Sequence, residues 1–531
     1  MASASGHLSV FRREPTLEEI EEAKKDITSH EASVVSIQQQ VAELKIQISH
    51  LLNQQHRHLR WISYHKGVAT LARRIPPEVL AKIFEHCVSY GWTRAPVTVS
   101  HVCSQWREAT KIYPRIWSTI YVDVDSAEAI GRTRFWLSRA AKAPLNIVLL
   151  ATWRATNSRI MDAMDILLRH ADQWKTFTLD MTTLHHIQTV TSLCSHASSS
   201  FPLLGDICFK TEVHSDEQGG TDSIDLHSAF DPQRAPNVIV FTLDASVLPM
   251  NMTYPQNIRF LDLSIKESTA QHTLSAISLI TLLRSFPALV QLSLSMPLRY
   301  ESPYMYEEDL DQIASLEYLD SLTLYGPTNL NHLLAHIRAP SLRELHLRSL
   351  EDKGFRQEPV GPSLVAFIRN SENLPRTLEC LELHDIDLSP SFFEYCFKTL
   401  RNLRELRLHE SSISDRTLAS LNGDSLGGLC PSLSILDLRW CGYLSGRAIV
   451  NLVRSRNHND PIDASSSTSF DVDIPTTAAR EATLLEQRQL NPITQITIIN
   501  CCFVRDQDIF DLASSTRCRV IPREGDYCGK F

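Results

Sequence analysis

The sequence lacks the short motifs that mark many enzymes. It has no glycine-rich phosphate loop, no C-x-x-C pair and no H-E-x-x-H sequence. No stretch reaches the length of apolar residues that a membrane-spanning helix needs. The opening residues, MASASGHLSVFRREP, lack the apolar core of a signal peptide. We therefore expect a protein of the cytoplasm or nucleus, not an enzyme, with no cofactor and no metal.

An excess of positive charge and a disulfide framework are also missing. The net charge is −9 at pH 7, whereas dedicated nucleic-acid binders usually carry an excess of Lys and Arg. Twelve cysteines are spread over 531 residues, and without a secretory signal they are expected to be reduced thiols. Hydrophobic residues make up 43% of the chain, which is enough for a large core.

What the sequence does contain is a dense block of apolar side chains from Arg73 to Trp117. Ile75-Pro76-Pro77-Glu78 predicts a helix start, because proline fits the first helical positions and glutamate suits the helix dipole. Apolar residues then recur at three- and four-residue steps, as on one face of a helix. A unit this short buries only a limited fraction of its surface, so part of the apolar stripe is expected to bind a partner.

The same stretch resembles an F-box, the motif that docks substrate receptors onto a cullin–RING ubiquitin ligase. Three blocks carry the resemblance in order: I-P-P-E-V-L-x-x-I-F, V-S-H-V-C-x-x-W-R and P-x-I-W. Ile75 stands where the family usually has leucine. The resemblance implies an all-helical F-box domain over residues 71–118 that binds a Skp-type adaptor. The docking residues we infer are Ile75, Pro76, Leu80, Ile83, Phe84, Val99, Val102, Trp106 and Trp117.

Those docking residues cannot all face the adaptor, since some must form the domain's own core. Trp117 also directly precedes the first expected strand, Ile120–Val124. Its side chain could therefore serve that junction as much as the adaptor.

A long helix is predicted before this block. Residues 1–26 are polar and read as a flexible tail. Residues 27–70 are predicted to form a long helix, and a heptad rhythm that runs from Ile27 and ends at Gln55 and His58 is typical of a short coiled coil. The apolar positions of that rhythm are Ile27, Val34, Ile37, Val41, Leu44, Ile48 and Leu51. Two interpretations stay open: self-association through residues 27–58, or packing of this helix on the helices that follow it.

From residue 119 to residue 531, an L-x-x-L-x-L pattern recurs. Examples are Leu342-Leu345-Leu347, Leu378-Leu381-Leu383 and Leu403-Leu406-Leu408. Copies mostly follow one another at spacings near those of leucine-rich repeats. One strand and one helix cannot bury their own apolar face, whereas stacked copies can. We predict an α/β leucine-rich-repeat solenoid, a curved parallel sheet with helices outside, with a disordered insertion near 457–479.

Strand periodicity predicts which side chains leave the core. The leucines of each copy face inward, so the alternate residues form rows on the concave face. The candidate substrate-binding residues are His346, Arg348, Glu382, His384, Arg407, His409, Asp437, Arg439 and Trp440. A solvated sheet face without a partner is the alternative, and Trp440 could equally pack against the adjoining turn.

Together these features predict the substrate-recognition subunit of an SCF-type ubiquitin ligase. The arrangement resembles the large F-box families of mushroom-forming fungi. The expected partners are a Skp-type adaptor, a cullin through that adaptor, and a protein substrate. Two alternatives remain: a leucine-rich-repeat scaffold that does not deliver substrates, or an enzyme whose site forms only in the folded solenoid.

Overall fold

The computed structural model describes most of the chain and separates it into two compact units. The described residues are 14–69, 75–211, 224–245, 252–255, 257–265, 276–296, 313–326, 328–349, 360–423, 429–457, 490–501 and 503–521. The first unit runs to Cys87 and takes in Val97–Ile112, and the second contains Val88–Pro96 and everything from Tyr113 onward. The insertion predicted near 457–479 lies almost entirely outside the described residues.

The first unit opens with the long helix α1, Leu17–Ala69. It begins earlier than the predicted range of 27–70 because Thr16 and Glu19 cap it. The Thr16 backbone N–H donates to Glu19 Oε2 at 2.9 Å, and the Glu19 N–H donates to Thr16 Oγ1 at 3.3 Å. This reciprocal pair satisfies donors that a helix start otherwise leaves open.

Three short helices follow: α2 (Pro77–Ser89), α3 (Ala95–Ser100) and α4 (Ser104–Ile112). Pro77 opens α2, as its fixed φ angle predicts. The Phe84 ring packs against Trp106 with centroids 5.0 Å apart. Gln105 Nε2 donates to the Ile75 carbonyl at 3.2 Å, which ties the start of α2 to α4.

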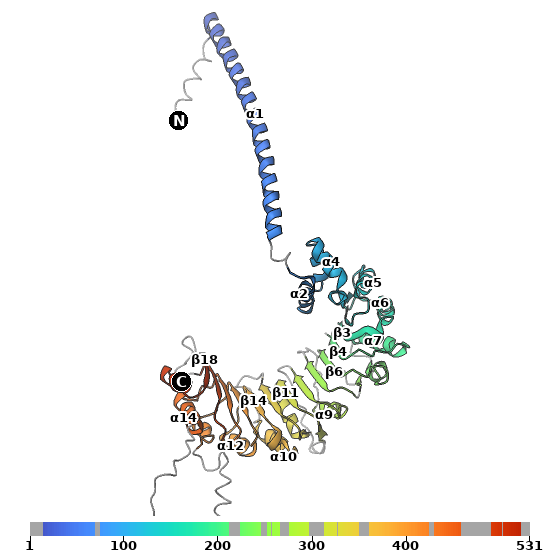
Figure 1. The fold of residues 1–531 in the computed structure, drawn as a ribbon, viewed down its shortest axis with the longest axis vertical. Helices are drawn as coiled ribbons and strands as arrows, with labels where there is room; N and C mark the ends of the chain where they lie inside the picture. Colours follow the sequence, from blue (N-terminus) through green and yellow to red (C-terminus); the bar gives the residue numbers. More distant parts are fainter. Residues whose placement is uncertain are drawn as a thin grey trace, which may run out of the picture. The chain divides into compact units, whose positions relative to one another are not determined.

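The second unit is built on one parallel sheet of fourteen strands whose order follows the chain (Figure 1). Each strand pairs with the next in parallel, as the recurring pattern predicted. The strands are β1 (Thr119–Asp123), β2 (Leu145–Ala151), β3 (Trp174–Met181), β4 (Asp206–Thr211), β6 (Val240–Ala245), β8 (Phe260–Ile265), β9 (Gln291–Ser295), β11 (Ser321–Gly326), β13 (Glu344–Ser349), β14 (Cys380–His384), β15 (Glu405–His409), β16 (Ile435–Arg439), β17 (Gln495–Ile499) and β18 (Arg517–Ile521).

Helices connect many of the successive strands and line one side of the sheet (Figure 1). The longer ones are α5 (Ala129–Ala140), α6 (Asn157–Leu168), α7 (Leu184–His196), α9 (Ala276–Arg284), α10 (Gly361–Asn370), α12 (Pro390–Thr399), α14 (Gly446–Asn457) and α16 (Asp506–Ala513). Further helices include the 3-10 helix η7 (Thr328–His336) and the shorter η3 (Pro114–Trp117), α8 (Leu226–Ala229), α11 (Leu374–Thr377) and α13 (Asp415–Ala419). None of the helices in the described ranges is both long and apolar enough for a bilayer crossing.

The core of this unit is made by the leucines of the repeated pattern. Leu345, Leu381, Leu406, Leu436 and Ile496 are register partners from one strand to the next. All five are at most 1% exposed, because each stacks on its neighbour between the sheet and the helices. The architecture is therefore the predicted α/β leucine-rich-repeat type. Strand β18 was not predicted as a repeat, since its inward residues include Cys518 rather than leucine.

Candidate protein-binding surfaces

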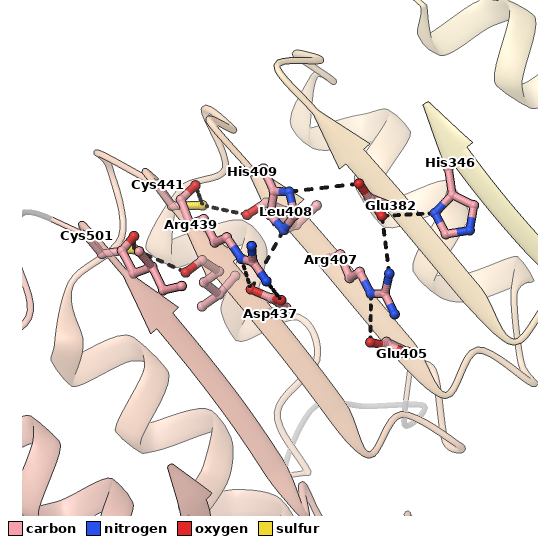
Figure 2. A network of polar contacts seen from close by, with 12 residues as sticks. His346, Glu382, Glu405, Arg407, Leu408, His409, Asp437, Arg439, Cys441 and Cys501 are labelled. Atoms are coloured by element: carbon pink, nitrogen blue, oxygen red, sulfur yellow. Dashed lines mark hydrogen bonds and ion pairs between the residues drawn. The ribbon is translucent and has the colours of Figure 1, made fainter. Parts of the chain in front are cut away.

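The parallel register lines up polar side chains on the face of the sheet turned away from the helices (Figure 2). Below, we call this the concave face. One row contains His346, Glu382, Arg407, Asp437 and Thr497, each the register partner of the next. A second row contains Arg348, His384, His409 and Arg439. The register of the predicted rows is thus confirmed, and it places eight of the nine candidate residues on four adjacent strands, with Trp440 directly after β16.

Glu382 is the centre of an ion-pair network on this face (Figure 2). Its Oε2 lies 2.9 Å from His346 Nδ1 and accepts from Arg407 Nη1 at 3.3 Å. Its Oε1 accepts from Arg348, with Nη2 at 2.8 Å. Burial alone would favour the neutral acid, but the hydrogen bond with His346 and the nearby positive charges outweigh it. They lower the pKa of Glu382 to about 2.

A second cluster lies one strand further along. Arg439 forms a bidentate ion pair with Asp437. Its Nε donates to Oδ1 at 2.9 Å and its Nη2 donates to Oδ2 at 2.7 Å. His409 Nε2 lies 3.7 Å from Asp437 Oδ1, and its Nδ1 lies 4.0 Å from Glu382 Oε1. Burial opposes ionisation of Asp437, yet the nearby His409 ring and the two hydrogen bonds from Arg439 lower its pKa to about 2. His409 therefore links the two clusters.

Burial divides the candidate substrate-binding residues into two groups, a division that strand periodicity did not predict. Glu382, His409 and Asp437 are 9% exposed or less, because longer neighbouring side chains cover them. The side chains of Arg348, Arg407 and Arg439 stay 34–44% exposed. The buried acids thus hold arginines whose outer surfaces stay accessible, and a partner on this face would meet the arginines rather than the acids.

Trp440 occupies a backbone position that tryptophan rarely adopts. Each of four consecutive strands is followed by a residue with positive φ: Asp385 (52°), Glu410 (54°), Trp440 (58°) and Asn500 (57°). Asp and Asn tolerate this left-handed conformation, whereas a bulky side chain there is strained. About half of the Trp440 side chain is buried, since the residue is 48% exposed, so burial offsets only part of this strain. Strain of this kind clusters at binding sites, where the side chain has a use beyond stability.

Two further aromatic side chains near Trp440 were missed in the sequence reasoning. Tyr443 is 67% exposed and Phe503 is 61% exposed. Each follows the left-handed residue of its repeat by three positions, on neighbouring turns that are joined by a bridge between Ser445 and Phe503. Tyr443 and Phe503 therefore add exposed aromatic surface to the turns that follow β16 and β17, and Trp440 lies in the first of these turns. The signal available in the sequence was an aromatic residue at the same distance after the strand in two successive repeats.

The thiols that follow these turns have a structural role. Cys441 Sγ lies 3.3 Å from the Leu408 carbonyl oxygen, and Cys501 Sγ lies 3.8 Å from that of Leu438 (Figure 2). Each thiol therefore donates to the end of the preceding strand. Both side chains are buried, because a small residue fits where the chain leaves the strand.

One group on the concave face has the geometry for a metal ion. Among the described residues, ligand atoms of Glu382, His384 and His409 lie within 4.8 Å of one another. Both carboxylate oxygens of Glu382 are already paired, however, with Arg348 and Arg407. A divalent cation would have to displace or neighbour these two positive charges. The donor set therefore suits an ion-pair network better than a metal centre.

In the first unit, the predicted docking residues also separate by burial. Leu80 and Phe84 are 1% exposed and Val99 is 4% exposed, so they belong to the core, with Trp106 half-buried against Phe84. Ile83 is 42% exposed and Val102 is 58% exposed. Pro76 is exposed and Ile75 is half-buried. The accessible members of the set are therefore Pro76, Ile83 and Val102, with part of Ile75.

Trp117 is better explained as part of the solenoid. It lies in the second unit and is 4% exposed. Its ring packs edge-on against Trp136 at 5.3 Å and Phe135 at 5.7 Å, both on α5. It therefore caps the first repeat, which is the role that its place beside the first strand suggested.

A serine pattern also has to be considered. Gly423-Asp424-Ser425-Leu426-Gly427 fits the G-x-S-x-G sequence of α/β-hydrolases. That nucleophile turn joins a strand to a helix, whereas the element before Gly423 is the helix α13. Residues 424–428 lie outside the described ranges, so the pattern adds no catalytic geometry.

Comparisons with known proteins do not identify the chain. No protein-family model matches it, and no curated protein matches it. A crystal structure of a Bacteroides fragilis protein aligns over 58% of this chain and 78% of its own, with 12% identity and a TM-score of 0.31. A TM-score this low carries no argument about fold or function.

We predict that Glu382→Gln destabilises the second unit by about 2 kcal/mol at neutral pH, because the arginines and His346 lose a charged partner. The ionised Glu382 stabilises the fold above its unfolded pKa of 4.5, and this contribution disappears as the pH falls toward the folded pKa of about 2. Urea unfolding at several pH values should show the difference from wild type shrinking below pH 4.5. Glu344→Gln, on an exposed neighbour, is the control, and a pH-independent difference would contradict the assignment.

We predict that Trp440→Asn is more stable than Trp440→Ala by about 1 kcal/mol. Both changes remove the indole, but asparagine tolerates the left-handed backbone and alanine does not. Thermal unfolding of the two variants isolates the backbone strain from the lost side-chain packing. Equal stabilities would show that position 440 carries no such strain.

Proposed function

We propose that the chain is an F-box protein that serves as the substrate-recognition subunit of an SCF-type ubiquitin ligase. The observation that carries the proposal is the division of the helical segment 75–112 into a packed core and an apolar exterior. Leu80, Phe84 and Val99 hold the segment together, while Ile83 and Val102 leave apolar surface open. Together with the three F-box-like sequence blocks, this surface supports docking to a Skp-type adaptor and, through it, to a cullin.

The solenoid would then bind the substrate protein through its concave face. Interfaces are enriched in aromatic residues and arginine, and a few such residues carry most of the binding energy. Arg348, Arg407 and Arg439 are held in place by buried acids, and the half-exposed Trp440 directly follows Arg439. Held side chains lose less freedom when a partner binds. This supports the cluster as the site at which a polar protein segment is recognised.

A subunit of this kind accelerates ubiquitin transfer without catalytic residues of its own. It holds the substrate near the ubiquitin-carrying enzyme, which raises the effective concentration of the reacting groups. Such complexes act in the cytoplasm and nucleus, which is the location we propose for this chain. A non-degradative scaffold is the alternative, because the same two surfaces would bind the same partners.

The adaptor surface is tested by Ile83→Asp/Val102→Asp. Both side chains are accessible, so the double variant should fold, yet it should fail to co-purify with a Skp-type adaptor and cullin. The matched control is Met161→Asp/Leu203→Asp, which alters two exposed apolar residues of the solenoid. Retained adaptor binding by the Ile83/Val102 variant, with wild-type helicity by circular dichroism, would reject docking through this surface.

Receptor and scaffold are separated by the fate of bound proteins. Proteins whose amount on the chain rises when the proteasome is inhibited should reach that higher amount on Ile83→Asp/Val102→Asp without the inhibitor, because they still bind but are no longer ubiquitinated. The same proteins should be lost from Trp440→Asn, which keeps the adaptor. Bound partners whose turnover is unchanged by the adaptor-surface variant would favour the scaffold.

A further inference from the structure

Helix α1 carries an apolar stripe, interrupted at His30, that packs against none of the other residues the structure describes. Every side chain described on the helix is exposed or half-buried. The stripe steps by three and four residues, so its members share one side of the helix. Its first positions, called a in a heptad, are Ile27, Val34, Val41 and Ile48, and its fourth positions, called d, are Ile37, Leu44 and Leu51. Exposures of 43–62% leave all seven side chains accessible.

We propose that α1 pairs with α1 of a second copy of this chain as a parallel, in-register coiled coil. The choice of a parallel pair rests on the residue types at the a and d positions. The four apolar a positions are all β-branched, and two of the three apolar d positions are leucine. In parallel coiled coils, Ile or Val at a with Leu at d favours two strands. Helix α1 of a second copy has the same apolar stripe, so no other protein is needed to cover it.

The polar residues in the seam select the register. His30 and His58 fall at d positions, and Gln55 falls at an a position. In a parallel, in-register pair each of them meets its own copy, and polar meets polar. An antiparallel pair centred between Val41 and Leu44 would instead put Ile27 opposite His58. That antiparallel pair would still match His30 with Gln55, but an apolar side chain facing His58 leaves its hydrogen bonds unmet. The mismatch at Ile27 and His58 therefore favours the parallel arrangement, in which polar seam residues also lower stability.

The length of the helix also calls for a partner. It spans 53 residues, and most helical stability in proteins comes from packing of an apolar face rather than from helix propensity. Pairing along the stripe would bury that face. The dimer would carry two copies of the helical segment and two solenoids, and thus two concave faces. This inference does not depend on the proposed ligase function.

The test compares two isoleucines two residues apart on the same helix. Ile48 lies in the seam, whereas Ile46 points away from it and is 70% exposed. The full chain should sediment as a dimer, and a dilution series should give its dissociation constant. Ile48→Glu should shift the chain to monomer, while Ile46→Glu should remain dimeric. A monomeric wild type, or equal behaviour of the two variants, would overturn the proposal.

Orientation is tested by Val34→Cys under mild oxidation. In the parallel pair, residue 34 meets its own copy, so a disulfide-linked dimer should form well above the background of the native cysteines in the wild type. In the antiparallel pair, residue 34 faces residue 51. Cross-linking of Val34→Cys/Leu51→Cys without cross-linking of Val34→Cys alone would overturn the parallel arrangement. Ile48→Glu should still bind the Skp-type adaptor. A failure of the dimer and a failure of the proposed function would therefore give different results.

Discussion

The rest of the solenoid depends on the in-register parallel stacking of its strands. Because every strand pairs with the next in the same direction, the leucines of one copy rest on those of its neighbour. A single repeat could not bury these side chains, but a stack of repeats can. The same register aligns the residues between the leucines. The polar face is therefore a consequence of core packing, and its rows cannot shift without exposing the core.

The concave face shows how buried charge can prepare a surface for binding. Glu382 and Asp437 would be expensive to bury alone. They are stable here because arginines and histidines surround them, and the same contacts hold Arg348, Arg407 and Arg439 in place. A charged network of this kind favours one arrangement of the face over many. Trp440 adds a strained aromatic residue at the edge of that arrangement.

Much of the fold was predictable because its signals are local and periodic. The alternation of leucines predicted the strands and rows from β13 to β17, and the need to cover the leucines predicted helices along one side of the sheet. Strand β18 was missed because a cysteine and a valine replace the leucines. The start of α1 was missed because Thr16 and Glu19 act through a cap rather than through periodicity. On the candidate surfaces, residue identities were predictable and exposures were not.

The sequence by itself determined which side chains share a strand face, which share a helix face and which segment resembles an F-box. These follow from fixed periods of two residues in a strand and 3.6 in a helix. Only the tertiary structure decided that Glu382 is buried while Arg348 is accessible, and that Phe84 belongs to a core while Ile83 does not. It also assigned Trp117 to the first repeat, against Trp136. The physical reason is that burial depends on neighbours brought together from distant parts of the chain, and no local period encodes their sizes.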